Sequence, residues 1–397
     1  MSSGERLKRG AWVGLVALAA IWVAWLGFRV QTPGDYTPDY APAMNALLAG
    51  HLGGFFGHLP TNGAGGSLLL RAPASMLAAA MGSGQLTIFR FGAFFCVFLT
   101  GLLGLSLARL VRPGEWRALT RLTVVGLCVL SPAILDAILF GHPEEPLGAA
   151  LCVGAVLLAG RGRTTLAGLA LGLAVINKPW GILALPPVLL AARGDRAQLA
   201  AVAGAITGAW FGAAYLVSPA QFARAAHGAS TAVVAHPEDL WWPLARLHSV
   251  PGVTQAYLVP HLISAHARQL VVLLAVPPSL MLARRERGTG NALALLALLL
   301  LCRCLLDPSN HVYYQVPLVI AITAWEVTAG RFPVRALVAT GSFWLIFHAI
   351  SGTGSLTAQF VAYLMVTLPL GAMLLRPAIG LPQADRRTPA ARTLSTA

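Results

Sequence analysis

Long apolar runs separated by short arginine-bearing stretches constrain this chain more than any other feature. The runs cover roughly residues 11–30, 87–110, 122–140, 146–160, 165–177, 180–192, 198–217, 266–283, 291–306, 313–329, 335–350 and 356–375. A helix needs about 20 apolar residues to cross about 30 Å of hydrocarbon. The sequence therefore predicts an all-α polytopic membrane protein with about 12 transmembrane helices, in a range of about 10 to 13, because several runs are short, notably 165–177 and 180–192.

Composition excludes a soluble protein and argues against a nucleic-acid partner. Hydrophobic residues make up 57% of the chain and charged residues 11%, against about 25% charged residues in soluble proteins. The net charge of +14 could indicate nucleic-acid binding, but the basic residues are spread thinly between apolar runs. Membrane lipids are therefore the expected surroundings, and we predict no nucleic-acid partner.

The distribution of charge predicts the orientation. With an even number of spans, the loops on the N-terminal side carry most of the arginines, which makes both termini cytoplasmic. The acids Asp35, Asp39, Glu144, Glu145 and Asp307 then fall on the outer side. We predict one transmembrane domain over 1–376, with longer extracytoplasmic loops at 31–86 and 218–265. The polar segment 377–397 is predicted to be a disordered cytoplasmic tail.

The stretch QTPGDYTPDYAPAMNALLAGHL, which follows the first apolar run, places two carboxylates just past a predicted membrane exit. The chain has only 14 acidic residues, so Asp35 and Asp39 need an explanation. A carboxylate at a water–lipid boundary can act as a general base toward a hydroxyl group. Asp39 also suits the N-cap of the amphipathic helix that follows, so the stretch leaves two roles open.

The motif GHPEEP supplies His142, Glu144 and Glu145 in a short outer loop. These residues could bind sugar hydroxyls or a metal ion. Alternatively, the two glutamates could simply favour the N-terminal end of the next helix through its dipole. Asp136, about one turn before this loop, could join the same group.

Two cations at span ends are candidates for binding phosphate. Lys178, in INKPWG, is the only lysine after the N-terminal segment, and Arg303 begins RCLLDPSNHVYY. Arginine suits forked recognition of phosphate, and lysine binds it as a point charge. Lys178 could instead extend its amine to the membrane surface, and Arg303 could pair with Asp307 four residues later on one helix. Arg71 and His311 are further candidates.

No Walker or dinucleotide-binding motif is present, so no nucleotide site is predicted. An outward-facing enzyme without nucleotide needs an activated substrate that arrives in the membrane. A sugar carried on a lipid phosphate meets this requirement.

These stretches resemble the C-type (GT-C), polyprenyl-phosphate-dependent glycosyltransferases. GDYTPDYAPAMNALLAG is similar to the first-loop pattern of family 87, the bacterial mannosyltransferase-like group, and GHPEE, NKPW and RCLLDPSNHVYY are similar to later stretches of that group. The resemblance implies a GT-C fold and inverting transfer of a sugar, often mannose, from a polyprenyl phosphate to a lipid or cell-envelope glycan acceptor. It implies an active site outside the bacterial cytoplasmic membrane. It places the base on Asp35 and a following aromatic on Tyr40, while Asp39 departs from the pattern.

The expected roles follow from these motifs and from the resemblance. The base is Asp35 or Asp39, no cofactor is required, and dependence on a divalent metal is left open. The remaining residues form two groups, the donor phosphate-binding Lys178, Arg303, His311 and Arg71 and the sugar- or acceptor-binding Tyr40, His142, Glu144, Glu145 and Asp307. Two rival interpretations are a secondary transporter or flippase of a lipid-linked or small anionic substrate, and a non-catalytic assembly partner that keeps the fold.

Overall fold

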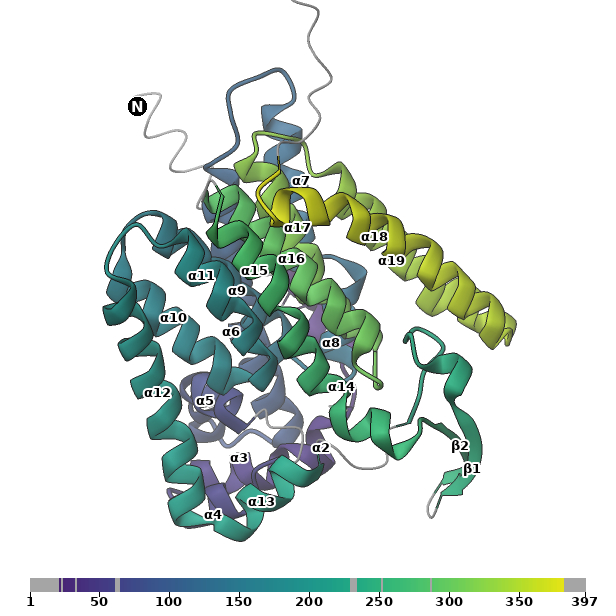
Figure 1. Cartoon of the computed structure of the whole chain (residues 1–397). Helices are drawn as coiled ribbons and strands as arrows, with labels where there is room; N and C mark the ends of the chain where they lie inside the picture. Colours follow the sequence, from purple (N-terminus) through teal and green to yellow (C-terminus); the bar gives the residue numbers. More distant parts are fainter. Residues whose placement is uncertain are drawn as a thin grey trace, which may run out of the picture.

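The computed structural model describes residues 21–22, 24–32, 34–60, 65–228, 234–250, 253–285 and 288–381. Most of the described chain is helical (Figure 1). The first half contains α2 (Tyr36–Asp39), α3 (Ala41–Leu48), α4 (Leu52–Gly57), α5 (Gly65–Ala80), α6 (Gln85–Ala108), α7 (Arg117–Val129), α8 (Pro132–Leu139), α9 (Glu144–Gly160), α10 (Thr164–Asn177), η1 (Pro179–Ala184) and α11 (Leu185–Ala191). The second half contains α12 (Arg196–Val217), α13 (Pro219–Gly228), η2 (Trp242–Leu244), β1 (Arg246–Val250), β2 (Val253–Leu258), α14 (His261–Leu274), α15 (Val276–Ala283), α16 (Thr289–Leu306), η3 (Val312–Tyr314), α17 (Gln315–Thr328), α18 (Val334–Trp344), η4 (Leu345–Ile350), η5 (Ser351–Thr353) and α19 (Leu356–Ala378).

Seven helical segments in the described ranges are long and apolar enough to cross a membrane. They are Gln85–Ala108, Arg117–Leu139, Arg196–Val217, His261–Ala283, Thr289–Leu306, Val334–Thr353 and Leu356–Ala378. The predicted all-α, multi-pass membrane fold is therefore confirmed. Shorter helices, namely α9, α10, η1 with α11, and α17, occupy four further predicted runs. The total of twelve spans stays a prediction, and most of the first run, 11–30, lies outside the described residues.

The centre of the fold is built from α9, α16 and α17. Every residue from Ala292 to Leu301 in α16 and from Gln315 to Val327 in α17 is buried, so these helices contact protein on all sides. Apolar all-round helices of this kind are expected in a protein core. α9 packs against both of them, and its N-terminal end carries Glu144 and Glu145.

Small residues allow α10 and α12 to approach closely. A Cβ added to Gly168 would lie 2.7 Å from the Leu199 carbonyl oxygen, and one added to Gly172 would lie 2.9 Å from the Ile206 Cβ atom. Glycines four residues apart form the small-xxx-small pattern that brings membrane helices together. This packing holds the C-terminal end of α10, where Lys178 follows, against the rest of the bundle.

Both long loops predicted from the sequence contain ordered elements. The range 31–86 contains α2 to α5, and α5 buries half of its residues, so part of this range is packed helix rather than loop. In 218–265, β1 and β2 form an antiparallel hairpin with Leu247 opposite Tyr257. The indole N–H of Trp241, within this range, donates to the Leu306 carbonyl (2.8 Å). This hydrogen bond ties the loop to the end of α16.

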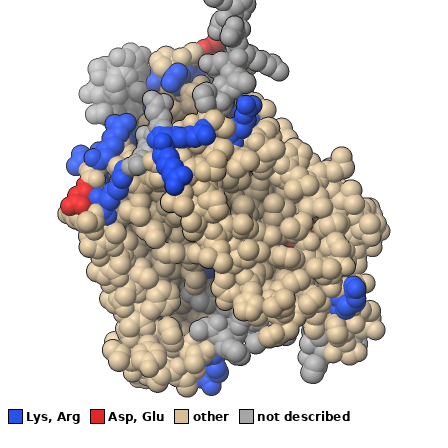
Figure 2. All heavy atoms as spheres, viewed as in Figure 1, with Lys and Arg blue, Asp and Glu red and all other residues tan. Residues whose placement is uncertain are grey.

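Basic side chains are concentrated toward one end of the molecule. Lys and Arg side chains gather toward the top of Figure 2, where Figure 1 shows the connections between α6 and α7 and between α11 and α12. Helices α2, α3, α4 and α13 lie at the opposite end. Between these ends, the visible surface is broadly uncharged, as expected for a surface that faces lipid.

Candidate active site

Asp35 is held in place by its backbone. Its N–H donates to the Phe140 carbonyl at the end of α8 (3.0 Å), which joins the first loop to the loop before α9. Gly34 has a φ of +52° and lies so close that an added Cβ would be 2.6 Å from the same Phe140 oxygen. Arg90 of α6 donates to the Val30 carbonyl (Nε–O 3.1 Å), which fixes the preceding turn. Three segments distant in sequence therefore determine where the Asp35 carboxylate lies.

His142 bridges two acids. Its Nε2 lies 3.2 Å from Asp35 Oδ2, and its Nδ1 lies 2.8 Å from Glu144 Oε1. The Tyr40 hydroxyl donates to the same Glu144 oxygen (3.0 Å). His142, Glu144 and Tyr40 are buried, whereas 59% of the Asp35 side chain is exposed. The bridge therefore links a buried acid to one that a substrate can reach.

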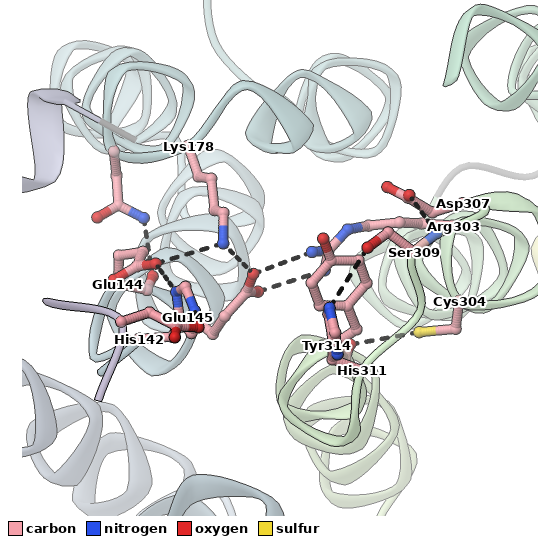
Figure 3. A network of polar contacts seen from close by, with 12 residues as sticks. His142, Glu144, Glu145, Lys178, Arg303, Cys304, Asp307, Ser309, His311 and Tyr314 are labelled. Carbon is pink, nitrogen blue, oxygen red and sulfur yellow. Dashed lines mark hydrogen bonds and ion pairs between the residues drawn. The ribbon is translucent and has the colours of Figure 1, made fainter. Parts of the chain in front are cut away.

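Glu145 forms ion pairs with Lys178 and Arg303, the two cations predicted to bind phosphate (Figure 3). Arg303 approaches it in a fork, with Nη2–Oε1 at 2.9 Å and Nη1–Oε2 at 3.3 Å. Lys178 Nζ lies 2.8 Å from Glu145 Oε1 and 3.3 Å from Glu144 Oε1. The contacts therefore run without interruption from Asp35 through His142, Glu144 and Lys178 to Glu145 and Arg303.

Aromatic rings enclose the two cations. The Arg303 guanidinium lies 4.0 Å from the centre of the Tyr314 ring and 4.8 Å from that of Trp180. Lys178 Nζ lies 5.7 Å from the Tyr314 ring and 5.9 Å from the Tyr313 ring. Cations over ring faces gain electrostatic attraction, most of all where water is excluded. The rings thus offset part of the cost of removing these charges from water.

Charge is almost balanced within the network. Lys178 and Arg303 oppose Glu144 and Glu145, and all four side chains are at most 7% exposed. A buried ion needs such pairing, because an isolated charge in a low-dielectric interior is very costly. The exposed Asp35 carboxylate lies at the edge of this neutral group and pairs there with His142.

The surroundings shift three pKa values at the exposed end. The hydrogen bond from His142 and its charge lower the pKa of Asp35, against the effect of partial burial. Burial favours neutral His142, but the Glu144 charge and hydrogen bonds to both acids outweigh it and raise the pKa of His142. Burial and the neighbouring Asp35 raise the pKa of Asp39. Asp35 therefore stays ionised at lower pH than Asp39, next to a histidine that readily carries charge.

The remaining predicted residues lie around the network. Asp39 is exposed and ends α2, and the N-cap of α3 is Tyr40, so the predicted capping role of Asp39 is wrong. Arg71 of α5 is buried, donates to Ser67 and faces the Tyr40 ring at 5.6 Å. His311 stacks on Tyr313 (5.1 Å between ring centres), which itself stacks on His142 (4.3 Å).

The observed ion pairs contradict three alternatives that the sequence left open. Arg303 and Asp307 do not pair with each other, because Arg303 binds Glu145 and Asp307 binds Arg268 (Nε–Oδ2 3.2 Å). Lys178 does not extend toward the membrane surface but is buried against the two glutamates. Asp136 pairs with His348 (3.0 Å) instead of joining the GHPEEP residues.

Two residues that contact the site residues, Arg268 and Trp180, were not singled out from the sequence. Arg268 lies in HARQLVVLLAV, where a lone arginine within an apolar run could have marked it as functional. Trp180 belongs to the NKPW motif, but nothing in its spacing indicates that it packs on Arg303. Within the described ranges, no three His, Cys, Asp or Glu side chains are grouped as metal ligands would be.

Comparison with known proteins identifies the family. The family model described as glycosyltransferase family 87 matches residues 66–308, which is more than half of the chain. The chain belongs to glycosyltransferase family 87. The matched range includes Glu144, Lys178 and Arg303, whereas Asp35 precedes it. This family 87 chain is therefore a membrane glycosyltransferase, as the sequence resemblance indicated.

A solved structure supports the GT-C fold of this family 87 protein. ArnT from Cupriavidus metallidurans, crystallised with undecaprenyl phosphate, superposes with a TM-score of 0.50 at 17% sequence identity. The match covers 94% of this chain and 78% of ArnT. At this identity the likeness concerns the fold alone. A search of curated proteins finds no match.

Proposed function

We propose that this protein transfers a sugar from a polyprenyl-phosphate carrier to a hydroxyl of a lipid or cell-envelope glycan, with inversion at the anomeric carbon. The observation that carries the proposal is the network from exposed Asp35 to buried Lys178 and Arg303. Asp35 takes the proton of the acceptor hydroxyl while that oxygen attacks the anomeric carbon. The cations stabilise the negative charge that develops on the leaving phosphate.

An apolar groove supports a lipid-linked donor. Residues of η1 and α11 form one wall and residues of α14 and α15 form the other, including Ile182, Pro186, Val272 and Ser279. Val272 lies one helical turn beyond Arg268 on α14. Ile182 lies four residues beyond Lys178. The groove therefore leads away from two of the site's cations, as a polyprenyl chain attached to a bound phosphate would require. Undecaprenyl phosphate, the ligand of the ArnT crystal structure, belongs to this class of lipid.

The positive-inside rule supports an outward-facing site. The loops between α6 and α7 and between α11 and α12 carry several exposed arginines, which favours a cytoplasmic position for that end. Asp35 and its network would then face the outside of the bacterial cytoplasmic membrane, with both termini inside. We further propose that residues 1–376 form one transmembrane domain and that 377–397 form a cytoplasmic tail.

The test is sugar transfer by purified protein. Wild type and the variants Asp35→Asn and Asp39→Asn would be given labelled polyprenyl-phosphate mannose and other polyprenyl-phosphate sugars, with lipid extracts as acceptors. Loss of a general base is expected to reduce turnover by about 10²- to 10⁴-fold in Asp35→Asn. Asp39→Asn should remain within several-fold of wild type.

The outcomes separate the rival interpretations. Wild-type turnover by Asp35→Asn, with loss in Asp39→Asn, would move the base to Asp39. Accumulation of a lipid-linked substrate across proteoliposomes without any transfer product would favour a transporter instead.

A further inference from the structure

The contacts of His142 define its protonation state. Carboxylate oxygens only accept hydrogen bonds, and a neutral imidazole has a single N–H. Both ring nitrogens nevertheless face carboxylates, Nδ1 toward Glu144 and Nε2 toward Asp35. Glu144 Oε1 also accepts from Tyr40 and Lys178, as an ionised carboxylate would. When Asp35 and Glu144 are both ionised, both contacts of His142 are therefore hydrogen bonds only if the ring is an imidazolium.

We propose that protonated His142 is the positioning residue for the base, holding Asp35 ionised and aimed at the acceptor only while the ring carries its second proton. This inference rests on the proposed function, in which Asp35 is the base. With Oδ2 bound to His142, the other carboxylate oxygen of Asp35 is left to accept the acceptor proton.

The transfer step balances without a further reactant. The acceptor O–H bond breaks and its proton goes to the Asp35 oxygen opposite Oδ2. The acceptor oxygen forms a bond to the anomeric carbon, and the bond from that carbon to the phosphate oxygen breaks with its electron pair leaving on phosphate. More than half of the Asp35 side chain is exposed, so the proton can leave to water and reset the base.

Groups from several elements face the His142 ring. They are Asp35 before α2, Asp39 on α2, Glu144 on α9, Tyr40 edge-on at 6.1 Å and Tyr313 stacked at 4.3 Å. Beyond them lie the Lys178 charge and the His311 ring, whose pKa burial lowers to about 3. Glu144 and the two hydrogen bonds raise the pKa of His142, while burial and Lys178 oppose them. His142 in turn lowers the pKa of Asp35.

These shifts define a pH window for activity. The active form needs ionised Asp35 and protonated His142. Activity should therefore be lost below the lowered pKa of Asp35 and above the raised pKa of His142. A bell-shaped dependence of kcat/KM on pH reports these two groups in the free enzyme.

The test compares pH profiles of kcat/KM for full-length wild type, His142→Asn and Glu144→Gln, assayed with polyprenyl-phosphate mannose. His142→Asn should lose the alkaline limb, and its acid limb should move to higher pH, because Asp35 loses its cationic neighbour. The maximum of kcat/KM should fall by up to about 100-fold, because the Asp35 carboxylate is no longer held in position toward the acceptor. Glu144→Gln should instead move the alkaline limb to lower pH.

His348→Asn provides a matched control, because His348 also binds an aspartate, Asp136, through Nε2 (3.0 Å) but lies outside the network. Its profile should keep both limbs. An alkaline limb that persists unchanged in His142→Asn would overturn the positioning role. If His142→Asn does not fold, an unmoved alkaline limb in Glu144→Gln would overturn it equally. Failure of the proposed function is a different result, namely no transfer by wild type or full activity of Asp35→Asn.

Discussion

Gly34 offers the sharpest test that Asp35 must lie where the structure places it. Gly34→Ala would put a Cβ 2.6 Å from the Phe140 carbonyl oxygen, and restoring an ordinary contact of 3.4 Å would move the loop by about 0.8 Å. The same movement stretches the hydrogen bond from the Asp35 N–H to that oxygen. A misplacement of about 1 Å at a reacting group can reduce the rate about 100-fold, or about 2.7 kcal/mol of transition-state stabilisation.

Gly50 supplies the control for backbone strain. It also has a positive φ, +74°, but an added Cβ would meet nothing within 4 Å. Gly34→Ala and Gly50→Ala therefore share the cost of a left-handed non-glycine residue, about 1–2 kcal/mol, and differ in the contact with Phe140.

The assay is sugar transfer at saturating donor, together with the thermal unfolding temperature of each variant. We expect similar small losses of stability in both variants, and a large loss of turnover in Gly34→Ala alone. Wild-type turnover in a folded Gly34→Ala protein would refute the argument that the Phe140 carbonyl sets the position of the base.

Two further predictions concern the donor. Val272→Trp should narrow the apolar groove and raise KM for long-chain donors by about tenfold or more, with little effect on a short-chain donor; Leu273→Trp, on the same helix but outside the groove, should change neither value. Glu145→Gln should lower the thermal unfolding temperature, because it leaves buried cations undercompensated, and undecaprenyl phosphate should restore it. Glu326→Gln, which also removes a buried acid bound to an arginine, should not be restored by that lipid, and equal restoration of both variants would contradict a phosphate site at Glu145.

Apolar runs predicted most helices well because length and hydropathy are local properties. The run at 198–217 corresponds to α12, Arg196–Val217, and that at 356–375 corresponds to α19, Leu356–Ala378. The same criterion missed α5, since Arg71 and Pro73 interrupt its apolar character. Arg71 is tolerated there because the folded protein buries it beside Ser67 and Tyr40, which no local pattern reveals.

The sequence predicted which residues belong to the site better than it predicted which residues pair with one another. Asp35 and Lys178 were singled out because acidic residues and lysines are rare in this chain. Charged residues near membrane spans are also energetically costly, which indicates a functional role. Spacing on one helix suggested that Arg303 pairs with Asp307, but that rule compares residues within a single helix. Glu145, on another helix 158 residues away, binds Arg303 instead. Such partners depend on tertiary packing, so local spacing alone could not determine them.

The pairing changes how a donor can bind. Lys178 and Arg303 do not form an open cationic pocket, because both contact the carboxylate of Glu145. A phosphate that reaches them must compete with that carboxylate, so binding exchanges one anion for another. A sugar phosphodiester carries one negative charge, whereas the phosphate monoester that leaves carries about 1.5 to 2 at neutral pH. In the proposed mechanism, the two cations interact more strongly with the leaving group as the bond breaks than with the donor, which is the condition for lowering a reaction barrier.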